Sequence, residues 1–320
     1  MEGHSTPKFV CLPHNGRKLS YLEMGCSQEE AKHSLVVLHG VGSSRLAAMP
    51  GVSEETLKAF GVRLIALDRP GYGQSDPDPD MTLESACDDL EQVLDILRLG
   101  DKIFLLGFSC GGAYCYAAAR FIPHRIAGIA LWCPIGCYHW KGISHEDRLL
   151  MQSKVSHSSR LLASFGNRLP FFLLRWYISL AIARRAGKPW VQNCQKCLCS
   201  PDRLHLQLLE PSDLMLRDNL EALTTHKGYG MARDLHLVSN HWGFELEDIA
   251  EVYTGPIHIW QGDEDNLVPI HMQRFVEKKI PENVQLREMK GEGHLSWFCF
   301  NNEAHRETLT ALFGEVETSL

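Results

Sequence analysis

The chain has 320 residues, and 44% of them are hydrophobic, which is enough to form one large core. We expect a single domain that carries an insertion. The formal net charge of -7 and the pI near 6.1 argue against a nucleic-acid partner, because the phosphate backbone favours a basic face on the protein.

The first residues and the cysteines indicate the compartment. Residues 1–15 contain no unbroken apolar run of the kind that a secretory signal needs, so we expect no export by that route. The 11 cysteines are odd in number and scattered, and several lie inside apolar runs, as Cys87, Cys115 and Cys133 do. This pattern is typical of reduced thiols and not of a disulfide framework. We therefore predict a cytoplasmic protein.

The predicted elements begin with a hairpin. Residues 8–24 form two short strands joined at His14, Asn15 and Gly16, where the Asn-Gly pair favours a tight turn. Continuous apolar runs follow, and strands that are apolar on both faces are typical of a sheet covered by helices on both sides. These runs span residues 35–38, 62–67, 103–106, 126–131 and 257–260.

Helical segments alternate with these runs. The clearest spans residues 82–97, where apolar side chains recur at helical spacing behind a Thr82 cap. Alternation of strand and helix predicts an α/β fold with a doubly wound, mostly parallel sheet.

Residues 136–247 interrupt the alternation. They contain helical patterns at 163–186 and 211–223 but no strong strand run. We therefore predict a helical insertion between two parts of one core, residues 1–135 and 248–320.

The longest apolar stretch lies inside this insertion, at 169–183. Arg175 interrupts it, and it is too short and too charged to span a bilayer, so we expect no stable membrane insertion. A lid helix is the favoured interpretation and a plain packing helix comes next. Contact with a membrane surface is the least favoured.

A candidate nucleophile follows the strand at 103–106. Residues 107–111 read Gly-Phe-Ser-Cys-Gly, and a helix of small residues comes next. Gly-x-Ser-x-Gly between a strand and a helix presents the serine, here Ser109, on a strained turn, and its neighbours two residues away have room for little side chain. The alternative is a plain glycine-rich turn that binds a phosphate at the helix N-terminus.

A serine nucleophile needs a base, and the base needs an acid. His294 is the predicted base, because it follows the last strand run, 284–289, in a Gly-Glu-Gly-His loop. Three acids follow the strand at 257–261. Asp265 is favoured because it stands just before the segment that starts the next helix, and Asp263 is the alternative.

Two backbone N–H groups are candidates for an oxyanion hole, which stabilises the charge of a tetrahedral intermediate. One belongs to Cys110, the residue after the serine. The other belongs to Val41, in the loop His-Gly-Val-Gly at 39–42 after the strand at 35–38. The alternative interpretation of this loop is a structural glycine turn.

Five motifs occur in one order: His-Gly-x-Gly at 39–42, Asp-Arg-Pro-Gly-Tyr-Gly at 68–73, Gly-x-Ser-x-Gly at 107–111, the segment 265–269, and Gly-x-Gly-His at 291–294. Together they resemble the serine-nucleophile branch of the α/β-hydrolase superfamily, and the segment 261–269 is similar to plant members. The resemblance implies an α/β-hydrolase fold with about eight strands, a triad in the order serine, acid, histidine, and no metal or organic cofactor. Serine at position 109, where aspartate would stand, argues against the dehalogenase and epoxide hydrolase branches.

The resemblance and the residues together predict a serine hydrolase that acts on an ester or similar acyl bond of a small apolar molecule. The predicted substrate contacts are Phe108, Phe171, Phe172, Trp176, Trp242 and Phe244. The alternatives are a non-hydrolytic member, such as a lyase, a cyclase or a small-molecule receptor, and an interaction protein that keeps the triad as a relic. A zinc site at Cys194, Cys197 and Cys199 with His205 is not favoured, because only the first two cysteines have the usual spacing.

Overall fold

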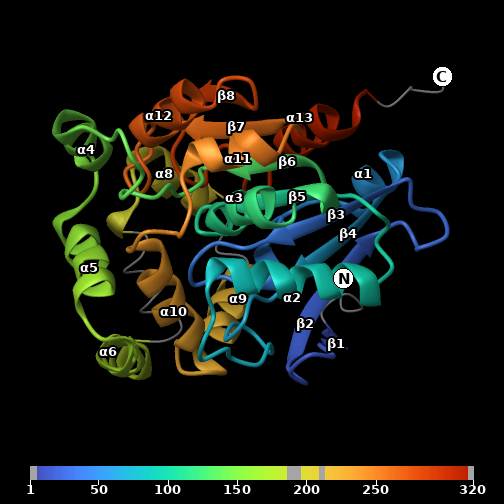
Figure 1. Cartoon of the computed structure of the whole chain (residues 1–320), viewed down its shortest axis with the longest axis horizontal. Coiled ribbons are helices and arrows are strands. Elements are labelled where there is room, and N and C mark those ends of the chain that lie inside the picture. The colour runs from blue at the N-terminus through green and yellow to red at the C-terminus, as the bar shows by residue number, and fades with distance from the viewer. Residues whose placement is uncertain (1–5, 186–195, 209–212, 316–320) are drawn as a thin grey trace.

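The computed structural model describes residues 6–185, 196–208 and 213–315. Its centre is an eight-stranded sheet in the order β1-β2-β4-β3-β5-β6-β7-β8 (Figure 1). The strands are β1 (Lys8–Cys11), β2 (Lys18–Gly25), β3 (His33–Leu38), β4 (Val62–Leu67), β5 (Ile103–Phe108), β6 (Ile126–Trp132), β7 (Ile257–Gly262) and β8 (Val284–Met289). The pairs β1–β2 and β2–β4 are antiparallel and the other five are parallel. The predicted doubly wound, mostly parallel sheet is thus confirmed.

The first two strands form the predicted hairpin. The N–H of Leu12 donates to the carbonyl of Arg17 at 2.8 Å, and the N–H of Gly16 donates back to the carbonyl of Leu12 at 2.8 Å. Gly16 has φ of +72°, a backbone conformation that glycine adopts without a steric penalty. This is the physical reason why the Asn-Gly pair indicates the turn correctly.

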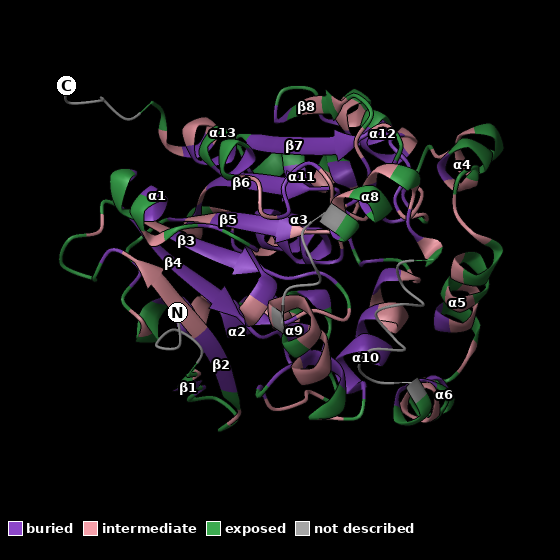
Figure 2. Ribbon diagram, turned by 180° about the vertical axis from the view of Figure 1, so that it is seen from behind, coloured by how far each residue is buried: buried purple, intermediate pink, exposed green. Residues whose placement is uncertain are grey.

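Helices cover both faces of the sheet, and the strands are buried accordingly (Figure 2). In β3, Val36 and Leu38 belong to one core cluster, and Leu35 and Val37 belong to the other. The first cluster includes residues of α2 (Leu83–Ile96), α3 (Gly111–Phe121), α11 (Leu246–Val252) and α12 (His271–Lys279). The second includes residues of α1 (Glu54–Ala59) and α13 (Asn302–Phe313). Apolar residues on both faces of a strand therefore follow from burial on both sides.

The helix expected at 82–97 is α2. It begins at Leu83, and the hydroxyl of its N-cap, Thr82, accepts the N–H of Ser85 at 3.0 Å. The hydroxyl of Ser85 in turn accepts the N–H of Thr82 at 2.9 Å, which completes a capping box. The position of the predicted cap is thus confirmed.

Six described helices lie between β6 and α11 and gather beyond one end of the sheet (Figure 1). They are α4 (His145–Gln152), α5 (His157–Arg168), α6 (Phe171–Arg185), α8 (Ser200–Leu208), α9 (Asp213–Thr224) and α10 (Tyr229–Val238). No strand occurs among the described residues of this segment. None of the described helices is long and apolar enough to cross a membrane.

The prediction of one helical segment at 163–186 is wrong in one respect, because the structure has two helices there, α5 and α6. The division falls at Leu169, whose ψ of 138° is extended. Leu169 precedes Pro170, and a proline ring disfavours the helical conformation in the residue before it. The pattern expected at 211–223 corresponds to α9, although its first two residues lie outside the described part of the chain.

Candidate active site

Ser109 lies on the tight turn between β5 and α3 with φ of +51°, which is unusual for a residue other than glycine. Such a conformation costs on the order of 1 kcal/mol and persists only where the surroundings enforce it. A Cβ atom at Gly107 would lie 2.6 Å from the sulfur of Cys115, and one at Gly111 would collide with the carbonyl oxygen of Leu38. The steric explanation of the Gly-x-Ser-x-Gly spacing therefore fits this structure.

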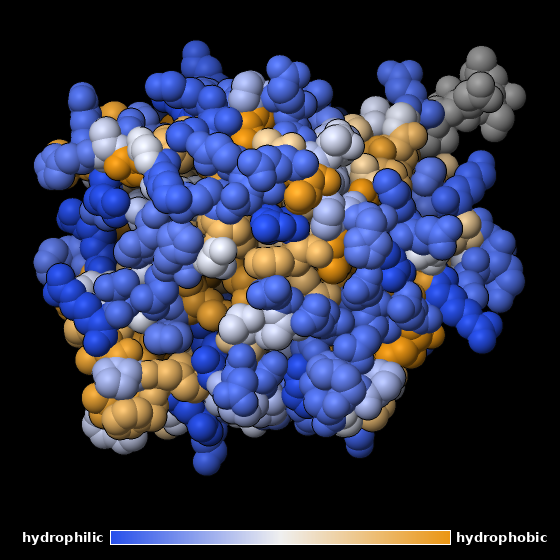
Figure 3. Space-filling view, viewed as in Figure 1, coloured by the Kyte–Doolittle hydropathy of each residue, from blue (hydrophilic) through white to orange (hydrophobic). Residues whose placement is uncertain are grey.

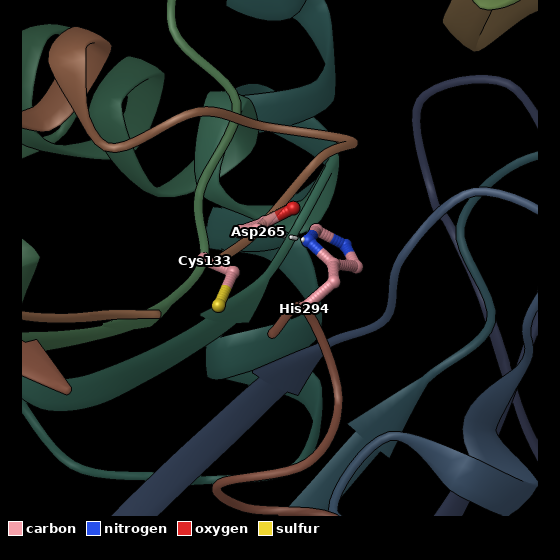
Figure 4. A group of neighbouring side chains, drawn as sticks. All are labelled: Cys133, Asp265 and His294. Atoms are coloured by element: carbon pink, nitrogen blue, oxygen red, sulfur yellow. Dashed lines mark hydrogen bonds and ion pairs between the residues drawn. The ribbon is translucent and has the colours of Figure 1, made fainter. Parts of the chain in front are cut away.

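Asp265 and His294 face each other from the loops that follow β7 and β8 (Figure 4). His294 Nδ1 and Asp265 Oδ2 are 2.7 Å apart, and both side chains are buried. The other carboxylate oxygen, Oδ1, accepts the N–H groups of Leu267 at 2.8 Å and Val268 at 2.9 Å. The side-chain amide of Gln261 donates to Oδ2 at 2.9 Å. This set of donors holds the carboxylate in place against the imidazole.

The neighbouring acids have other partners. Asp263 Oδ1 accepts the N–H of Gly291 at 2.7 Å, and this contact is exposed. Glu264 forms an exposed ion pair with Lys154 at 3.2 Å. Of the three acids that follow β7, the structure thus places Asp265 against His294.

The electrostatic surroundings of His294 have opposing effects on its pKa. Burial alone would lower the pKa, because it disfavours the charged imidazolium. The charge of Asp265, its hydrogen bond to the ring and the charge of Asp202 outweigh burial, so the pKa of His294 is raised above its ordinary value. The pair therefore stabilises an imidazolium, as a base that receives a proton from a hydroxyl requires.

A cavity of about 280 Å³ opens in front of the serine, and both Ser109 and His294 line it. The ring of Phe108 also lines it, with its centroid 5.1 Å from that of the imidazole. The rest of the lining is mostly apolar and comes from the insertion, from the segment 41–50 and from the loops after β7 and β8. The apolar lining residues include Leu198, Leu206, Met215, Met231, Leu295 and Phe298.

The other five predicted substrate contacts lie elsewhere, which corrects the sequence analysis. The side chains of Phe172 and Trp176 are 69% and 65% exposed. The guanidinium carbon of Arg233 lies over the ring of Phe171, 3.7 Å from the ring centroid. Trp242 and Phe244 are buried in the core cluster that also contains residues of α3. Aromatic content indicates burial or contact, but without the packing of the insertion it does not tell which surface a ring faces.

The loop at 39–42 lies directly against the nucleophile turn. A Cβ atom at Gly40 would lie 3.0 Å from the ring of Phe108 and 3.3 Å from Cβ of Ser109, so a larger residue would fit here only if these neighbours shifted. The carbonyl of Gly40 accepts from Arg69 Nη2 at 3.3 Å and lies 2.8 Å from Nδ1 of His39. Because a trans peptide is planar, the N–H of Val41 points away from that carbonyl.

The two predicted oxyanion donors are available. Val41 lines the cavity, and Cys110 is the N-cap of α3. No described residue accepts a hydrogen bond from the backbone N–H of Val41 or of Cys110. A helix start with free N–H groups is a favourable place for negative charge.

Three buried aspartates of the insertion contact the loops of this site, and the sequence analysis missed them. Asp202 of α8 accepts the N–H groups of His294 at 2.9 Å, Leu295 at 2.8 Å and Ser296 at 3.0 Å. Its carboxylate is fully buried. The loop that carries the imidazole is therefore fixed to the insertion by three charge-assisted hydrogen bonds.

Asp218 of α9 contacts the segment that follows the 39–42 loop. It accepts the hydroxyl of Ser43 at 2.8 Å and both the hydroxyl and the N–H of Ser44, at 2.6 and 2.8 Å. It also accepts the N–H of Ala47 at 3.2 Å. Burial raises the pKa of Asp218 to about 7, against the hydrogen bonds of the two serines, which lower it.

Asp234 of α10 binds the residues behind the 39–42 loop. It accepts from Arg69 Nη1 at 2.6 Å and from the hydroxyls of Tyr72 and Tyr114 at 2.6 and 2.7 Å. Arg69 in turn donates to the carbonyl of His39 at 2.9 Å. No short sequence motif predicts the roles of these three aspartates, because the loops that they bind lie far away in the sequence.

The possible metal ligands are few. Among the described residues, only Cys133, Asp265 and His294 bring their ligand atoms within 4.8 Å of one another (Figure 4). Burial raises the pKa of Cys133 well above its ordinary value, and Asp265 and His294 already pair with each other at 2.7 Å. Cys194 lies outside the described residues, and His205 Nε2 lies 2.7 Å from the carbonyl oxygen of Cys299, so this ring nitrogen already has a partner.

Known proteins resemble this chain in sequence and in fold. Residues 34–298 match the family model described as alpha/beta hydrolase fold. Protein phosphatase methylesterase 1 of Schizosaccharomyces pombe is 36% identical over 159 residues, 47% of this chain and 43% of that protein. The 2-hydroxy-6-oxononadienedioate/2-hydroxy-6-oxononatrienedioate hydrolase of Klebsiella pneumoniae is 31% identical over 174 residues, 50% of this chain and 58% of that protein. The matches thus span about half the length of these relatives.

A solved structure extends the comparison of the fold to nearly the whole chain. Bromoperoxidase from Bacillus anthracis has a TM-score of 0.64 at 18% identity, over 97% of this chain and 100% of that chain. At this identity the likeness concerns the fold alone.

Proposed function

The chain belongs to the α/β-hydrolase fold family, and on that premise we propose that it is a serine hydrolase that cleaves an ester or related acyl bond of a small apolar molecule. One observation carries the proposal. Ser109, on its strained turn, and His294, held at Nδ1 by Asp265, line the same cavity. Because Asp265 engages Nδ1, the imidazole has Nε2 left to accept a proton from the serine.

The proposed reaction starts with attack of Ser109 Oγ on the substrate carbonyl carbon while His294 Nε2 takes the hydroxyl proton. The carbonyl electron pair moves to oxygen, where the N–H groups of Val41 and Cys110 stabilise the oxyanion. Collapse of this intermediate expels the alcohol, which receives the proton from His294 and leaves an acyl group on Ser109. Water, deprotonated by the same imidazole, then releases the acid and restores the serine.

The cavity supports the substrate class. Its lining is mostly apolar, with side chains such as Met215, Met231 and Phe298, and its volume of about 280 Å³ suits a small molecule. Polar groups lie beside the oxyanion loop, where Ser43, Asp218 and Asn219 line the wall. An apolar acyl or alcohol group would occupy the first region, and the carbonyl would lie near the second.

A fluorophosphonate probe tests the nucleophile. The wild-type protein should be labelled at Ser109, and Ser109→Ala should not be labelled. Ser43→Ala is the control for the second serine that lines the cavity: the hydroxyl of Ser43 donates to Asp218 at 2.8 Å and is hydrogen-bonded to no histidine among the described residues, so the variant should still be labelled at Ser109. Label that persists in Ser109→Ala would disprove the proposed nucleophile.

Product analysis on a panel of esters tests the reaction. We expect release of both acid and alcohol with water as the acceptor. A protein that is labelled at Ser109 but converts substrates without incorporating water would instead be a lyase or a cyclase, and one that binds esters without turnover would be a receptor.

A further inference from the structure

The segment 148–201 has a charge pattern unlike the rest of the chain. It contains nine of the 32 basic residues and none of the 39 acidic residues, so the remainder has 23 basic residues against 39 acidic ones. In the structure, residues 148–185 of this segment form the end of α4 and then α5 and α6, which follow one another along one side of the molecule (Figure 1 and Figure 2). An acidic protein thus presents a purely basic segment on one side.

Helix α6 within this segment is apolar on two opposite faces. Its inner face carries Leu174, Ile178 and Ile182, which are buried in a cluster with residues of α9 and α10. Its outer face is exposed, and Figure 3 shows an apolar patch at the corner where α6 lies. The large exposed side chains of α6 are Phe172, Leu173, Trp176 and Tyr177, from 41% to 69% exposed. A helix that is apolar all round is normally buried, and none of the described residues covers this outer face.

Arginines border the exposed aromatic side chains. Arg168, Arg175 and Arg184 are exposed, and none of the three forms an ion pair with a described acidic residue. Because residues three and four apart share a face of a helix, Arg184 extends the row of Phe172 and Trp176. Arg175 is three residues from Phe172, and its guanidinium lies over the ring of Tyr229, 4.9 Å from the ring centroid, at the edge of this face. The surface thus combines aromatic rings and guanidinium groups and contains no carboxylate from its own segment.

We propose that the outer face of α6 docks on the surface of an anionic phospholipid bilayer. Phe172 and Trp176 would insert at the level of the headgroups, and Arg168, Arg175 and Arg184 would lie beside the lipid phosphates. Aromatic rings with cations and without acids are the composition of helices that lie in this interface. A second copy of the chain fits less well, because a two-fold contact would place the same unpaired arginines against each other.

The surface is connected to the cavity through one layer of side chains. Met231 belongs to the cluster that packs against the inner face of α6, and it also lines the cavity. Docking would therefore hold the cavity close to the bilayer, where apolar molecules accumulate. The inference goes beyond the proposed function, because binding to a bilayer needs no turnover and can be measured without a substrate.

Sedimentation with lipid vesicles tests the proposal on the full chain. We expect strong binding to vesicles of phosphatidylcholine mixed with phosphatidylserine, weak binding to phosphatidylcholine alone, and loss of binding at high salt. The double variant Phe172→Ser and Trp176→Ser should weaken binding by about 100-fold or more, because the inserted apolar area is removed. Replacing Arg168, Arg175 and Arg184 by Gln should weaken it by about fivefold each, or about 100-fold together.

Matched controls separate this surface from general effects of charge and hydrophobicity. Phe9, on β1, is 50% exposed and far from α6, so Phe9→Ser should bind as the wild type does. Lys32, Lys58 and Lys102 are exposed near the amino ends of the parallel strands, and changing all three to Gln should have no more than a small effect. Melting curves should be unchanged in every variant, because all the changed side chains are exposed.

Two results would overturn the proposal. One is the absence of binding to the mixed vesicles at low salt, or equal binding by the α6 variants and the wild type. The other is a wild-type dimer in sedimentation velocity that dissociates in Phe172→Ser with Trp176→Ser and does not bind vesicles, which would make the face a contact between copies. Neither result would bear on the labelling of Ser109, so the two proposals fail separately.

Discussion

The substitution Asp202→Asn tests whether the insertion positions the catalytic base. Oδ1 of Asp202 accepts the N–H groups of Leu295 and Ser296, and Oδ2 accepts that of His294. The amide of asparagine can keep an oxygen for the first two but presents an NH2 group to the third. One buried N–H then lacks an acceptor, which costs about 1–3 kcal/mol, and two charge-assisted bonds become weaker neutral ones. We expect the free energy of unfolding to fall by about 3 kcal/mol, measured by urea denaturation.

The same substitution should change the pH dependence of kcat/KM on an ester substrate. His294 must be neutral to accept the serine proton, so activity falls as the pH drops through its pKa. The charge of Asp202 helps to raise that pKa, and removing the charge lowers it. The acid limb of the profile should therefore move to lower pH in Asp202→Asn.

Asp89→Asn is the matched control for this experiment. Asp89 is also buried, but it pairs with Arg17 at 2.6 Å, away from the residues that line the cavity. This variant should lose stability and keep the acid limb of the wild type. If Asp202→Asn behaved in the same way, Asp202 would be a structural residue only. If Asp202→Asn changed neither the stability nor the acid limb, the three N–H groups would not depend on the charge of Asp202.

Three further predictions follow from the same geometry. Asp265→Asn should lower kcat by on the order of 10⁴, whereas Asp263→Asn should stay within about tenfold, and the reverse ranking would reassign the acid. In Ser109→Ala, His294→Ala and the double variant, kcat should fall by a similar factor of roughly 10⁴ to 10⁶. If the losses multiplied in the double variant, the two residues would not act in one step. The pKa of Asp218 is raised from 3.8 to about 7 in the folded protein. Between these two pH values the carboxyl is protonated in the folded state and ionised in the unfolded state, so the stability that Asp218 contributes at low pH is lost as the pH rises. Asp218→Asn should remove this decrease in the free energy of unfolding with pH, which amounts to up to about 4 kcal/mol in urea denaturation. An unchanged pH dependence in the variant would exclude Asp218 as its source.

The sequence predicts the core because local patterns determine it. The run at 62–67 is a strand with every residue buried, and its residues are apolar except Arg63, which pairs with Glu23 at 2.6 Å. A strand that is apolar on both faces is typical of a sheet covered by helices on both sides. The glycines around Ser109 indicate the turn because side chains there would strike Cys115 and the backbone of Leu38. Even the error at 163–186 had a local signal, since Pro170 was present to divide the helix.

The sequence does not predict the wall of the cavity, because the insertion packs through contacts that are remote in the chain. Met215 and Met231 follow a helical period, but this period gives the spacing of a face and not the surface against which it packs. Trp242 was expected at the substrate and lies in the core, whereas Trp176 was expected there and lies in solvent. Whether an aromatic side chain of the insertion faces the cavity, the core or solvent depends on which helix of the insertion lies over the serine.

The three missed aspartates explain how the insertion and the catalytic loops are held together. Asp202 holds the loop of the imidazole, Asp218 the segment after the oxyanion loop, and Asp234 the arginine behind it. Moving α8, α9 or α10 outward would separate a buried carboxylate from at least three donors, and each donor left without an acceptor costs about 1–3 kcal/mol. We therefore expect these helices to keep their places during turnover. Helices α5 and α6 make no comparable contact with the catalytic loops among the described residues, so movement on docking would be confined to the side that carries the basic segment.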